Sequence, residues 1–421
     1  MRIAVVGAGI VGVTTAYELA TAGHQVTVFE RRSSVAEEGS FANAGVVAPG
    51  YVTPWAAPGM PTRVLGHLLS RYAPVRIRAA ALWRHPGWLW QWWRACAASA
   101  YQRNRSAMWR LARFSQARLA ELGTRLQLDY EQRSGLLVLL RNEADLARSR
   151  PGMRLLADLG VRFELVDAER ARLVEPGLNP DMPLRAAIHL PHEGVGNCRQ
   201  FAQLLKAQVA TQGASFRFDT AVKCVLPGPH PRIRTDEGES GFDAVVLCAG
   251  VDSARLLAPL GLQIPLVPVH GYSITAPLRH VDGQAEPGPN AALMDERYKV
   301  AISRIGQRVR VAGSAELGSD GDRMNPAALA TLYRVLDDWF PGAVVSSQAL
   351  QWKGARPMLP DGPPVLGHSG VDGVWLNLGH GSSGWAMSCG SALVLAELVS
   401  GRPSPLDLQG LGIERWRAGR P

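Results

Sequence analysis

The chain opens on a short apolar run, which is followed by glycines and then by a helical pattern. Residues 3–6 are apolar throughout, as expected of a buried parallel strand. A helical pattern then runs to Ala22, and Gly23 is a suitable helix stop. Residues 25–29 again have the pattern of a strand. The order strand, helix, strand predicts a βαβ unit at the N-terminus.

The turn between the first strand and the helix carries the pattern GxGxxG over residues 7–12. In a dinucleotide-binding turn the first glycine permits the tight turn, the second admits the pyrophosphate, and the third lets helix and strand pack closely. The start of the helix adds free N–H groups for phosphate. Glu30, at the end of the second strand, is placed to accept hydrogen bonds from ribose. This context predicts a dinucleotide site; the alternative is an ordinary glycine-rich turn.

Further along, apolar periodicity predicts alternating strands and helices around a long loop. A loop rich in small residues, Gly and Pro follows Glu30 and reaches residue 59, where regular βα units would be expected of an NAD-binding domain. Such a loop can lay backbone amides against a flat ring system. Helices are predicted at 61–128 (divided at Pro74 and Pro86), 143–159, 198–213, 325–340 and 385–400. Strands are predicted at 134–140, 185–190, 216–225, 243–248 and 374–378. The runs 267–269, 272–274, 300–303 and 309–312 predict an antiparallel sheet, and residues 352–362 a turn.

A second GxGxxG, at residues 379–384, lies between the last predicted strand and helix. No later strand ends in an acidic residue, so a second nucleotide site is not expected. A helix N-terminus aimed at a ring system stabilises negative charge that develops there, as on the pyrimidine edge of a reduced flavin. We therefore expect this turn at a flavin; the alternative is a tight packing turn.

The net charge of +9 is concentrated in one block of the 421-residue chain. From Gly39 to Ala120 there is no Asp or Glu, yet there are 11 Arg and seven of the 12 Trp. Arg and Trp at helical spacing suit the interface of an anionic membrane. Nucleic acid would also attract this charge, but no nucleic-acid motif accompanies it, so no nucleic-acid partner is expected. The alternative is that the tryptophans belong to a core and the arginines to a solvated face.

Two domains are expected from the length, and a cytoplasmic location from the rest of the sequence. The first strand begins at residue 2 or 3, which leaves no room for a signal peptide. No apolar run reaches the roughly 18 residues of a membrane-spanning helix. The five cysteines are scattered and read as reduced, mostly buried thiols, and no His/Cys cluster has metal-ligand spacing. A peripheral place on the inner face of the cell membrane is the other possibility.

Six segments together resemble FAD-dependent D-amino acid dehydrogenases, within the D-amino-acid-oxidase-like flavoproteins. They are GAGIVG from Gly7, FANAGVVAPGY from Phe41, PWAAPGMP from Pro54, HGYSIT from His270, KGARPMLPDG from Lys353 and GHGSSGWAMSCGS from Gly379. The resemblance spans the whole chain. It implies an α/β fold, α+β overall, with a Rossmann-like FAD-binding domain (1–62, 194–262 and 352–421) and an antiparallel-sheet substrate domain (63–193 and 263–351) that carries the Trp/Arg-rich insertion.

By the same resemblance, the cofactor is FAD and the reaction is oxidative deamination of a D-amino acid to a 2-oxo acid and ammonia. Hydride would pass from Cα to the flavin N5, and the electrons to a quinone-type acceptor of the membrane chain, with membrane contact through residues 63–118. The residues implied for FAD are Gly7, Ala8, Gly9, Ile10, Val11 and Gly12 in the first turn, Glu30 and Arg31 at the ribose, Ser40, Ala42, Asn43, Ala44 and Gly45 along pyrophosphate and flavin, Val222 near adenine, Ala249 and Gly250 at a strand end, and Gly379, Gly381, Ser382 and Ser383 at the flavin edge.

Four residues are predicted on the substrate side. Arg356 is expected to hold the substrate carboxylate, because a guanidinium offers a planar fork that Lys lacks; the alternative is a structural salt bridge. Tyr272 is expected to hydrogen-bond the same carboxylate. His380 is a candidate for tuning the pyrimidine edge of the ring, and Tyr51 for a mobile lid; the alternatives are a structural histidine and a surface aromatic.

Two departures from the family pattern leave the substrate open. Asn197 stands where the family more often has Asp, and Ser382-Ser383 changes the shape above the flavin. D-proline or D-hydroxyproline is therefore a second substrate class. An oxidase for glycine or N-methyl amines that uses oxygen, and a non-catalytic flavin-binding subunit of a membrane complex, are also compatible with these residues. A nicotinamide dehydrogenase is disfavoured by the loop after Glu30.

Overall fold

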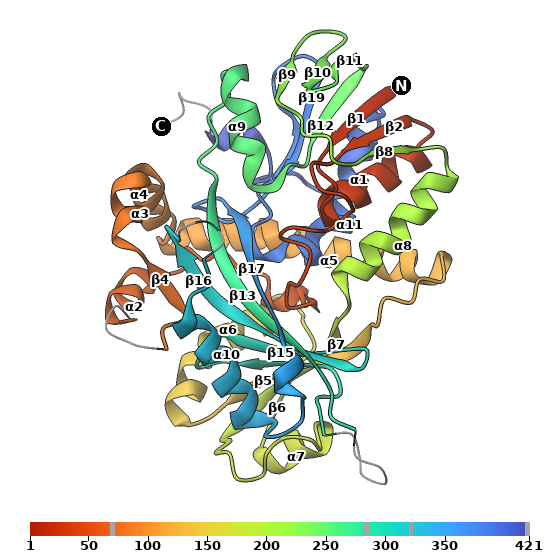
Figure 1. The fold of residues 1–421 in the computed structure, drawn as a ribbon. Helices are drawn as coiled ribbons and strands as arrows, with labels where there is room; N and C mark the ends of the chain where they lie inside the picture. The colour runs from red at the N-terminus through yellow and green to blue at the C-terminus, as the bar shows by residue number, and fades with distance from the viewer. Residues whose placement is uncertain (68–71, 281–286, 320, 322, 417–421) are drawn as a thin grey trace.

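The computed structural model describes residues 1–421 except 68–71, 281–286, 320, 322 and 417–421. Three sheets organise these residues (Figure 1). The first has six strands in the order β18-β19-β12-β1-β2-β8, which are all parallel to their neighbours except β18. Its strands are β1 (Arg2–Val6), β2 (Gln25–Phe29), β8 (Ser215–Arg217), β12 (Ala244–Leu247), β18 (Val365–His368) and β19 (Val374–Leu378).

Helices cover one face of this sheet and bury its apolar side chains. They are α1 (Ile10–Thr21), α8 (Cys198–Thr211), α11 (Gly384–Val399) and, against α11, the long α5 (Ala98–Arg125). Apolar side chains of α1, α8 and α11, such as Val13, Phe201 and Cys389, form one cluster with Val5 and Val28 of the strands. Gly390 lets α5 approach α11 closely, since a Cβ there would lie 2.9 Å from Ser115. The predicted βαβ unit is confirmed.

The second sheet has ten strands and crosses the middle and lower part of the molecule in Figure 1. Its main order is β17-β13-β16-β15-β14-β5-β7-β3, with β4 beside β16 and β6 beside β7. Its strands are β3 (Val46–Val47), β4 (Val75–Ile77), β5 (Arg133–Leu140), β6 (Glu164–Val166), β7 (Ala186–Val195), β13 (Val267–Pro277), β14 (Ala292–Asp295), β15 (Val300–Ile305), β16 (Arg308–Leu317) and β17 (Leu350–Met358).

The remaining elements surround the two large sheets. α10 (Pro326–Trp339) packs its apolar face on the second sheet. A small third sheet of β9 (Cys224–Leu226), β10 (Arg232–Thr235) and β11 (Gly238–Gly241) lies beside the first. The other helices are α2 (Met60–His67), α3 (Ala79–Arg84), α4 (Pro86–Ala95), α6 (Glu143–Asp158), α7 (Ala168–Val174) and α9 (Ser253–Leu257), with short 3₁₀ turns η1 (Pro49–Tyr51), η2 (Gly250–Asp252), η3 (Ala258–Leu260), η4 (Ser346–Gln348), η5 (Gly381–Ser383) and η6 (Ile413–Trp416).

Several predicted elements need correction, and in each case pairing with a distant strand explains the difference. The predicted turn at 352–362 begins as strand β17, which pairs with β13 from Val267 to Thr275. The runs 267–269 and 272–274 are one strand, β13. The predicted strand 185–190 continues as β7 to Val195, because its second half pairs with β5 and β3.

Further corrections concern sheet direction and continuity. The predicted strand 216–225 is two strands, β8 and β9, which belong to different sheets. The second sheet is mixed, since β14 runs parallel to β5 and β4 parallel to β16. The block 61–128, predicted to be helical, includes the strand β4. Residues 68–71 of this block lie outside the described chain, and so do residues 281–286 and 417–421, which fall within the predicted domains. The boundary predicted at residue 352 falls inside β17.

Candidate active site

A large cavity of about 1540 Å³ is lined by residues of both large sheets. Its walls include the first glycine-rich turn, the loop 37–57, the end of β12, the strands β13, β16 and β17, and the turn before α11. A site for an ordinary small ligand occupies roughly 300–1,000 Å³. The cavity therefore has room for an extended cofactor together with a small substrate.

The three glycines of the first turn have three different environments. Gly7 has φ +99°, and a Cβ there would lie 2.6 Å from the carbonyl oxygen of Cys248. A Cβ on Gly12 would lie 1.8 Å from the carbonyl oxygen of Gly7, so helix and strand touch there. Gly9 faces the cavity, where a Cβ would meet only the Ser40 hydroxyl, at 3.5 Å. Two glycines shape the turn, and the third keeps open the approach to the start of α1.

Glu30 and Arg31 both line the cavity, and their role at a ribose stays a prediction. The Glu30 carboxylate accepts the N–H groups of Ala8 at 2.7 Å and Arg32 at 2.9 Å. Burial is the main reason that its pKa is raised. Arg31 donates to Glu38 at 2.7 Å and also pairs with Asp252. Arg31 therefore joins the loop after β2 to the turn after β12, and Val222, Ala249 and Gly250 line the same part of the cavity.

The small-residue loop after β2 meets the start of α1. The Ser40 hydroxyl accepts the N–H of Ile10 at 3.0 Å, next to the open side of Gly9. Asn43 accepts the N–H of Gly45 at 2.9 Å and so closes a local turn. In this part of the cavity the wall is made by the loop residues Ser40, Ala42, Asn43, Ala44 and Gly45 and by Ile10 and Val11 at the start of α1. Ala8 and Gly12, which were also predicted to contact FAD, do not line the cavity.

The second glycine-rich turn places the start of α11 at the cavity wall. Gly379 (φ +77°) and Gly381 (φ +57°) adopt left-handed conformations that favour glycine. Ser383 precedes α11 without a side-chain hydrogen bond to the first turn of the helix. Gly379, Gly381, Ser382 and Ser383 all line the cavity, together with the first residues of α11. Free N–H groups at this helix end can stabilise negative charge on a ligand.

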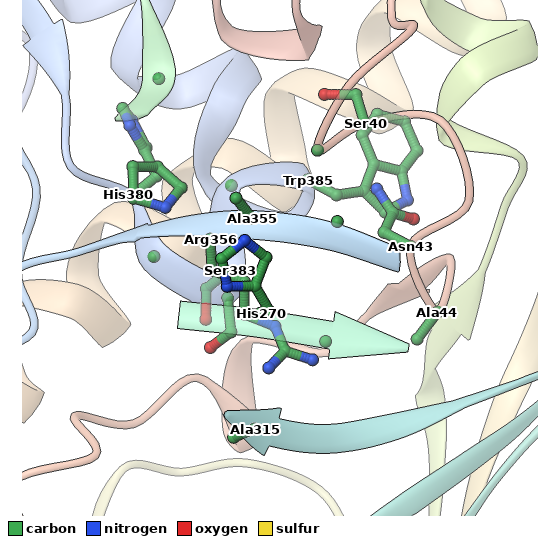
Figure 2. A pocket seen from close by; sticks show the side chains of 18 of the residues that line it. Ser40, Asn43, Ala44, His270, Ala315, Ala355, Arg356, His380, Ser383 and Trp385 are labelled. Carbon is green, nitrogen blue, oxygen red and sulfur yellow. The ribbon is translucent and has the colours of Figure 1, made fainter. Parts of the chain in front are cut away.

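Arg356 lies in the cavity wall on β17, and its charge has no carboxylate partner within the described parts of the chain. Its Nη1 donates to the carbonyl of Ser314 at 2.9 Å, and its guanidinium lies 5.7 Å from the centre of the Trp55 ring. Gly271, on the neighbouring strand, makes room for it. Burial lowers the pKa of Arg356 to about 10. In Figure 2, Ser40, Asn43 and Trp385 lie to one side of Arg356, and His380 lies to the other.

Tyr272, predicted to hydrogen-bond the substrate carboxylate, has a partner within the chain. Its side chain is buried, and its hydroxyl donates to the Glu316 carboxylate at 2.5 Å. Glu316 also accepts from Asn325 at 3.1 Å and pairs with Arg78. The single proton of the Tyr272 hydroxyl is therefore engaged with Glu316 in this structure, and the role of Tyr272 at a substrate carboxylate stays a prediction.

His380 and Tyr51 also line the cavity and have partners within the chain. The His380 Nε2 lies 3.0 Å from the hydroxyl of Ser391 in α11, and burial lowers the pKa of His380 to about 3. His380 is therefore neutral at physiological pH. The Tyr51 hydroxyl donates to Glu296 at 3.2 Å, and its pKa is raised, mainly by burial. Their roles at the ring and in a lid stay predictions.

Asn197 has a structural reason to differ from Asp. It caps α8 by accepting the N–H of Gln200 at 3.3 Å, and its amide nitrogen donates to Glu131 at 2.7 Å. An Asp side chain can accept the first bond, but it would face the Glu131 carboxylate with a second negative charge.

The tryptophans of the basic block are divided between core and surface. Trp88 is buried and donates to the carbonyl of Met358 at 3.3 Å. On α3 and α4, by contrast, Leu82, Trp83, Trp90 and Trp93 are 53%, 87%, 55% and 60% exposed. Among the described helices, none combines the length and apolar character that crossing a bilayer requires. No group of three or more potential metal ligands is found in the same described residues.

A model of the family described as DAO, FAD dependent oxidoreductase, matches residues 2–398. The chain belongs to this family. It is 42% identical to a D-amino acid dehydrogenase of Cereibacter sphaeroides (strain ATCC 17023), over 99% of this chain and 96% of that protein. It is 40% identical to a D-amino acid dehydrogenase of Rhizorhabdus wittichii, over 99% of this chain and 100% of that protein. Among solved structures, glycine oxidase from Geobacillus kaustophilus shares the fold, with a TM-score of 0.78, 21% identity, and coverage of 99% and 100%.

The predicted family, fold class and cofactor are thereby confirmed, and the wall of the cavity fits FAD. The side of Gly9 that faces the start of α1 is free for a pyrophosphate, and Glu30 keeps acceptor capacity for ribose hydroxyls at the same end. The start of α11, at another part of the wall, suits a flavin that gains negative charge. The enzyme is an FAD-dependent oxidoreductase.

Several residues of this DAO-family site were not predicted from the sequence. Ser314 has φ +58°, rare for a residue other than glycine, and its carbonyl accepts from Arg356. No sequence pattern predicts this conformation. Gly271 carried a usable signal, because a glycine inside a strand often marks the close approach of another group. Ser273 and Arg310, which donate to the backbone carbonyls of Ala42 and Asn43, were not singled out either.

Proposed function

We propose that this oxidoreductase oxidises the C–N bond of D-amino acids to give 2-oxo acids and ammonia. The observation that carries the proposal is Arg356, a guanidinium in the cavity wall with no carboxylate partner in the described chain. An enclosed cation of this kind is suited to a ligand carboxylate, which it can hold through two parallel hydrogen bonds. The names of the relatives that match over the full length support the D-configuration.

The chain's own part in this reaction is to bind and orient. Arg356 holds the carboxylate, while Ser314 and Gly271 fix the position of its guanidinium. FAD, when bound, supplies the two-electron acceptor. The substrate loses two electrons and two protons as the C–N single bond becomes an imine, which water then hydrolyses. His380 is neutral, so it adds no cation that would repel an ammonium group.

We further propose that the electrons pass to an acceptor at a membrane and that α3 and α4 meet its surface. Three exposed tryptophans and Leu82 on these helices form an apolar surface within a stretch that lacks acidic residues. Such a surface suits an anionic bilayer. Trp88 of α4 bonds to Met358 at the end of the strand that carries Arg356, so this surface adjoins the cavity wall. Transfer of the electrons to oxygen is the competing hypothesis.

The test is an anaerobic visible spectrum of the purified holoenzyme before and after addition of single D- and L-amino acids. Bleaching of the flavin absorbance by D-forms and not by L-forms is the expected result. Reduction by D-proline or D-hydroxyproline alone would narrow the substrate to cyclic imino acids, and reduction by glycine or sarcosine would replace the proposal with an amine oxidase. A flavin that no amine bleaches would overturn the catalytic function and favour a non-catalytic flavin-binding subunit. Peroxide formed during aerobic turnover would overturn the membrane acceptor.

A further inference from the structure

Residues 42–45, here called the flavin-side loop, have backbone carbonyls that accept hydrogen bonds from side chains of the second sheet and of α11. The Ser273 hydroxyl on β13 donates to the carbonyl of Ala42 at 2.8 Å. Arg310 on β16 donates through Nη1 to the carbonyl of Asn43 at 3.1 Å. The carbonyl of Gly45 accepts from the Trp385 indole at 3.1 Å and from the Gly196 N–H at 2.9 Å. Three of the four carbonyls in this stretch are therefore bound by groups within the protein.

Arg310 is an unusual group to find behind such a loop. Its side chain is buried, and no carboxylate of the described chain lies within ion-pair distance of it. Its Nε donates to the Thr275 hydroxyl at 2.9 Å, so the acceptors at its Nε and its Nη1 are both neutral. Burial lowers the pKa of Arg310 to about 10, which still leaves it charged at physiological pH. Burying a charge without an ion-pair partner destabilises the folded protein, so we expect the positive charge of Arg310 to act on a bound ligand.

The neighbouring cation on the same strand provides a contrast. Arg308, two residues earlier, is nearly half exposed, and its charge is compensated by Glu131 at 2.8 Å. Arg310 itself does not line the cavity, but Asn43, which it holds, does. Its charge is thus one residue layer behind the wall along which the flavin is expected. In a poorly polarisable interior, a charge at that depth acts more strongly than it would in water.

From this geometry we infer that Ser273 and Arg310 are positioning residues for the flavin, and that the buried charge of Arg310, which makes no ion pair and is only partly offset by the more distant Glu131, makes the bound flavin easier to reduce. Ser273 and Arg310 fix the backbone of residues 42–45 against the ring. The positive charge favours the reduced flavin, which carries negative charge on its ring, over the neutral oxidised form. The two effects are separable, because Ser273 contributes only to the first. The inference concerns FAD binding and holds whichever amine is the substrate.

The decisive measurement is the midpoint potential of the bound flavin, obtained by dye-coupled reductive titration, alongside the FAD dissociation constant. Arg310→Gln should shift the oxidised-to-reduced equilibrium about tenfold toward the oxidised form, or about 30 mV for a two-electron couple. Arg310→Lys keeps the charge and should keep most of the potential while binding FAD more weakly. Ser273→Ala should weaken FAD binding without moving the potential. Arg308→Gln removes a cation of the same strand that is paired with Glu131, so it should leave FAD binding unchanged and move the potential much less than Arg310→Gln.

Each result supports or overturns one half of the inference. An Arg310→Gln potential equal to that of the unmodified enzyme would show that the charge does not act on the flavin. Ser273→Ala and Arg310→Lys enzymes with unchanged FAD affinity would show that the loop needs no support from behind. If Arg310→Gln does not fold, Thr275→Val leaves the charge in place but removes one of its anchors. That variant should weaken FAD binding with an unchanged potential, and normal binding would count against the positioning role.

Discussion

The guanidinium of Arg356 lies flat against the backbone of Gly271: a Cβ at residue 271 would come within 2.3 Å of its Nη2. The two residues are on neighbouring antiparallel strands, β17 and β13. The cation therefore occupies the volume that any larger residue at position 271 would require. The place of Arg356 in the cavity depends on a glycine that touches no substrate.

Gly271→Ala should displace Arg356 and weaken substrate binding at least tenfold, with little change in FAD content. The reason is steric, since the methyl group would overlap three atoms of the guanidinium. The dissociation constant from the anaerobic reduction rate against substrate concentration measures the effect. Gly87→Ala, in α4 with open space around it and outside the cavity lining, is the control and should be neutral or slightly stabilising. Normal binding by Gly271→Ala would show that the position of Arg356 is not critical.

Arg356→Ala should weaken substrate binding far more than it changes FAD affinity. Loss of a buried ion pair to a ligand costs about 2–5 kcal/mol. Arg356→Lys should recover only part of this loss, because an ammonium keeps the charge but lacks the planar fork. The same reduction kinetics measure both variants. If Arg356→Ala turned over normally, the arginine would be a structural residue and the carboxylate would bind elsewhere.

Glu193 should make the protein less stable as the pH rises. Burial raises the pKa of Glu193 to about 7, from a usual value near 4.5. The folded state therefore holds the proton more tightly than the unfolded state, so stability is lost as the pH rises between these two values. Glu193→Gln keeps an acceptor for the Gly50 N–H, a bond of 3.1 Å in the unmodified protein, but cannot ionise.

Thermal unfolding at pH 5 and pH 8 tests this prediction. The two proteins should unfold at similar temperatures at pH 5. At pH 8 Glu193→Gln should be the more stable, by up to roughly 3 kcal/mol. An equal difference at both pH values would mean that Glu193 does not titrate in this window.

Replacing Trp83, Trp90 and Trp93 by Ala should reduce binding to vesicles that contain anionic lipid. Each buried aromatic side chain contributes roughly 1.5–3 kcal/mol, so the loss per tryptophan is about tenfold or more. Co-sedimentation with the vesicles measures it, and binding by the unmodified protein should weaken as salt is added. Leu173→Ala, at an exposed apolar residue of α7, is the control and should bind like the unmodified protein. Unchanged sedimentation of the triple variant would exclude α3 and α4 as the membrane-binding surface.

The parts of the fold that were predicted correctly are those whose pattern is local. β1, α1 and β2 follow from apolar periodicity and three glycines, all within 30 residues. β17, which contains Gly354 and Pro357, was predicted as a turn, yet it pairs with β13, whose residues lie 75 to 91 positions earlier in the chain. Isolated propensity carries no information about such pairing.

The candidate site shows the same division. The positions of Gly9, Glu30 and Arg356 in the cavity wall were predicted, since motifs mark them. The partner of Tyr272 is Glu316, 44 residues later, and no motif or periodicity links the two positions. The left-handed backbone conformation of Ser314 could not be predicted from the sequence either, because it depends on the strands that pair around this residue.

The loop that joins β2 of the first sheet to β3 of the second also has a consequence for assembly. Residues 42–45 follow β2 by little more than a dozen positions, yet their carbonyls are held by β13 and β16, which come more than 200 residues later. This part of the cavity wall is therefore complete only when both halves of the chain have docked. A ligand that binds only the assembled state stabilises that state in proportion to the logarithm of its concentration. We therefore expect the supply of FAD to set how much of the polypeptide is in its assembled form.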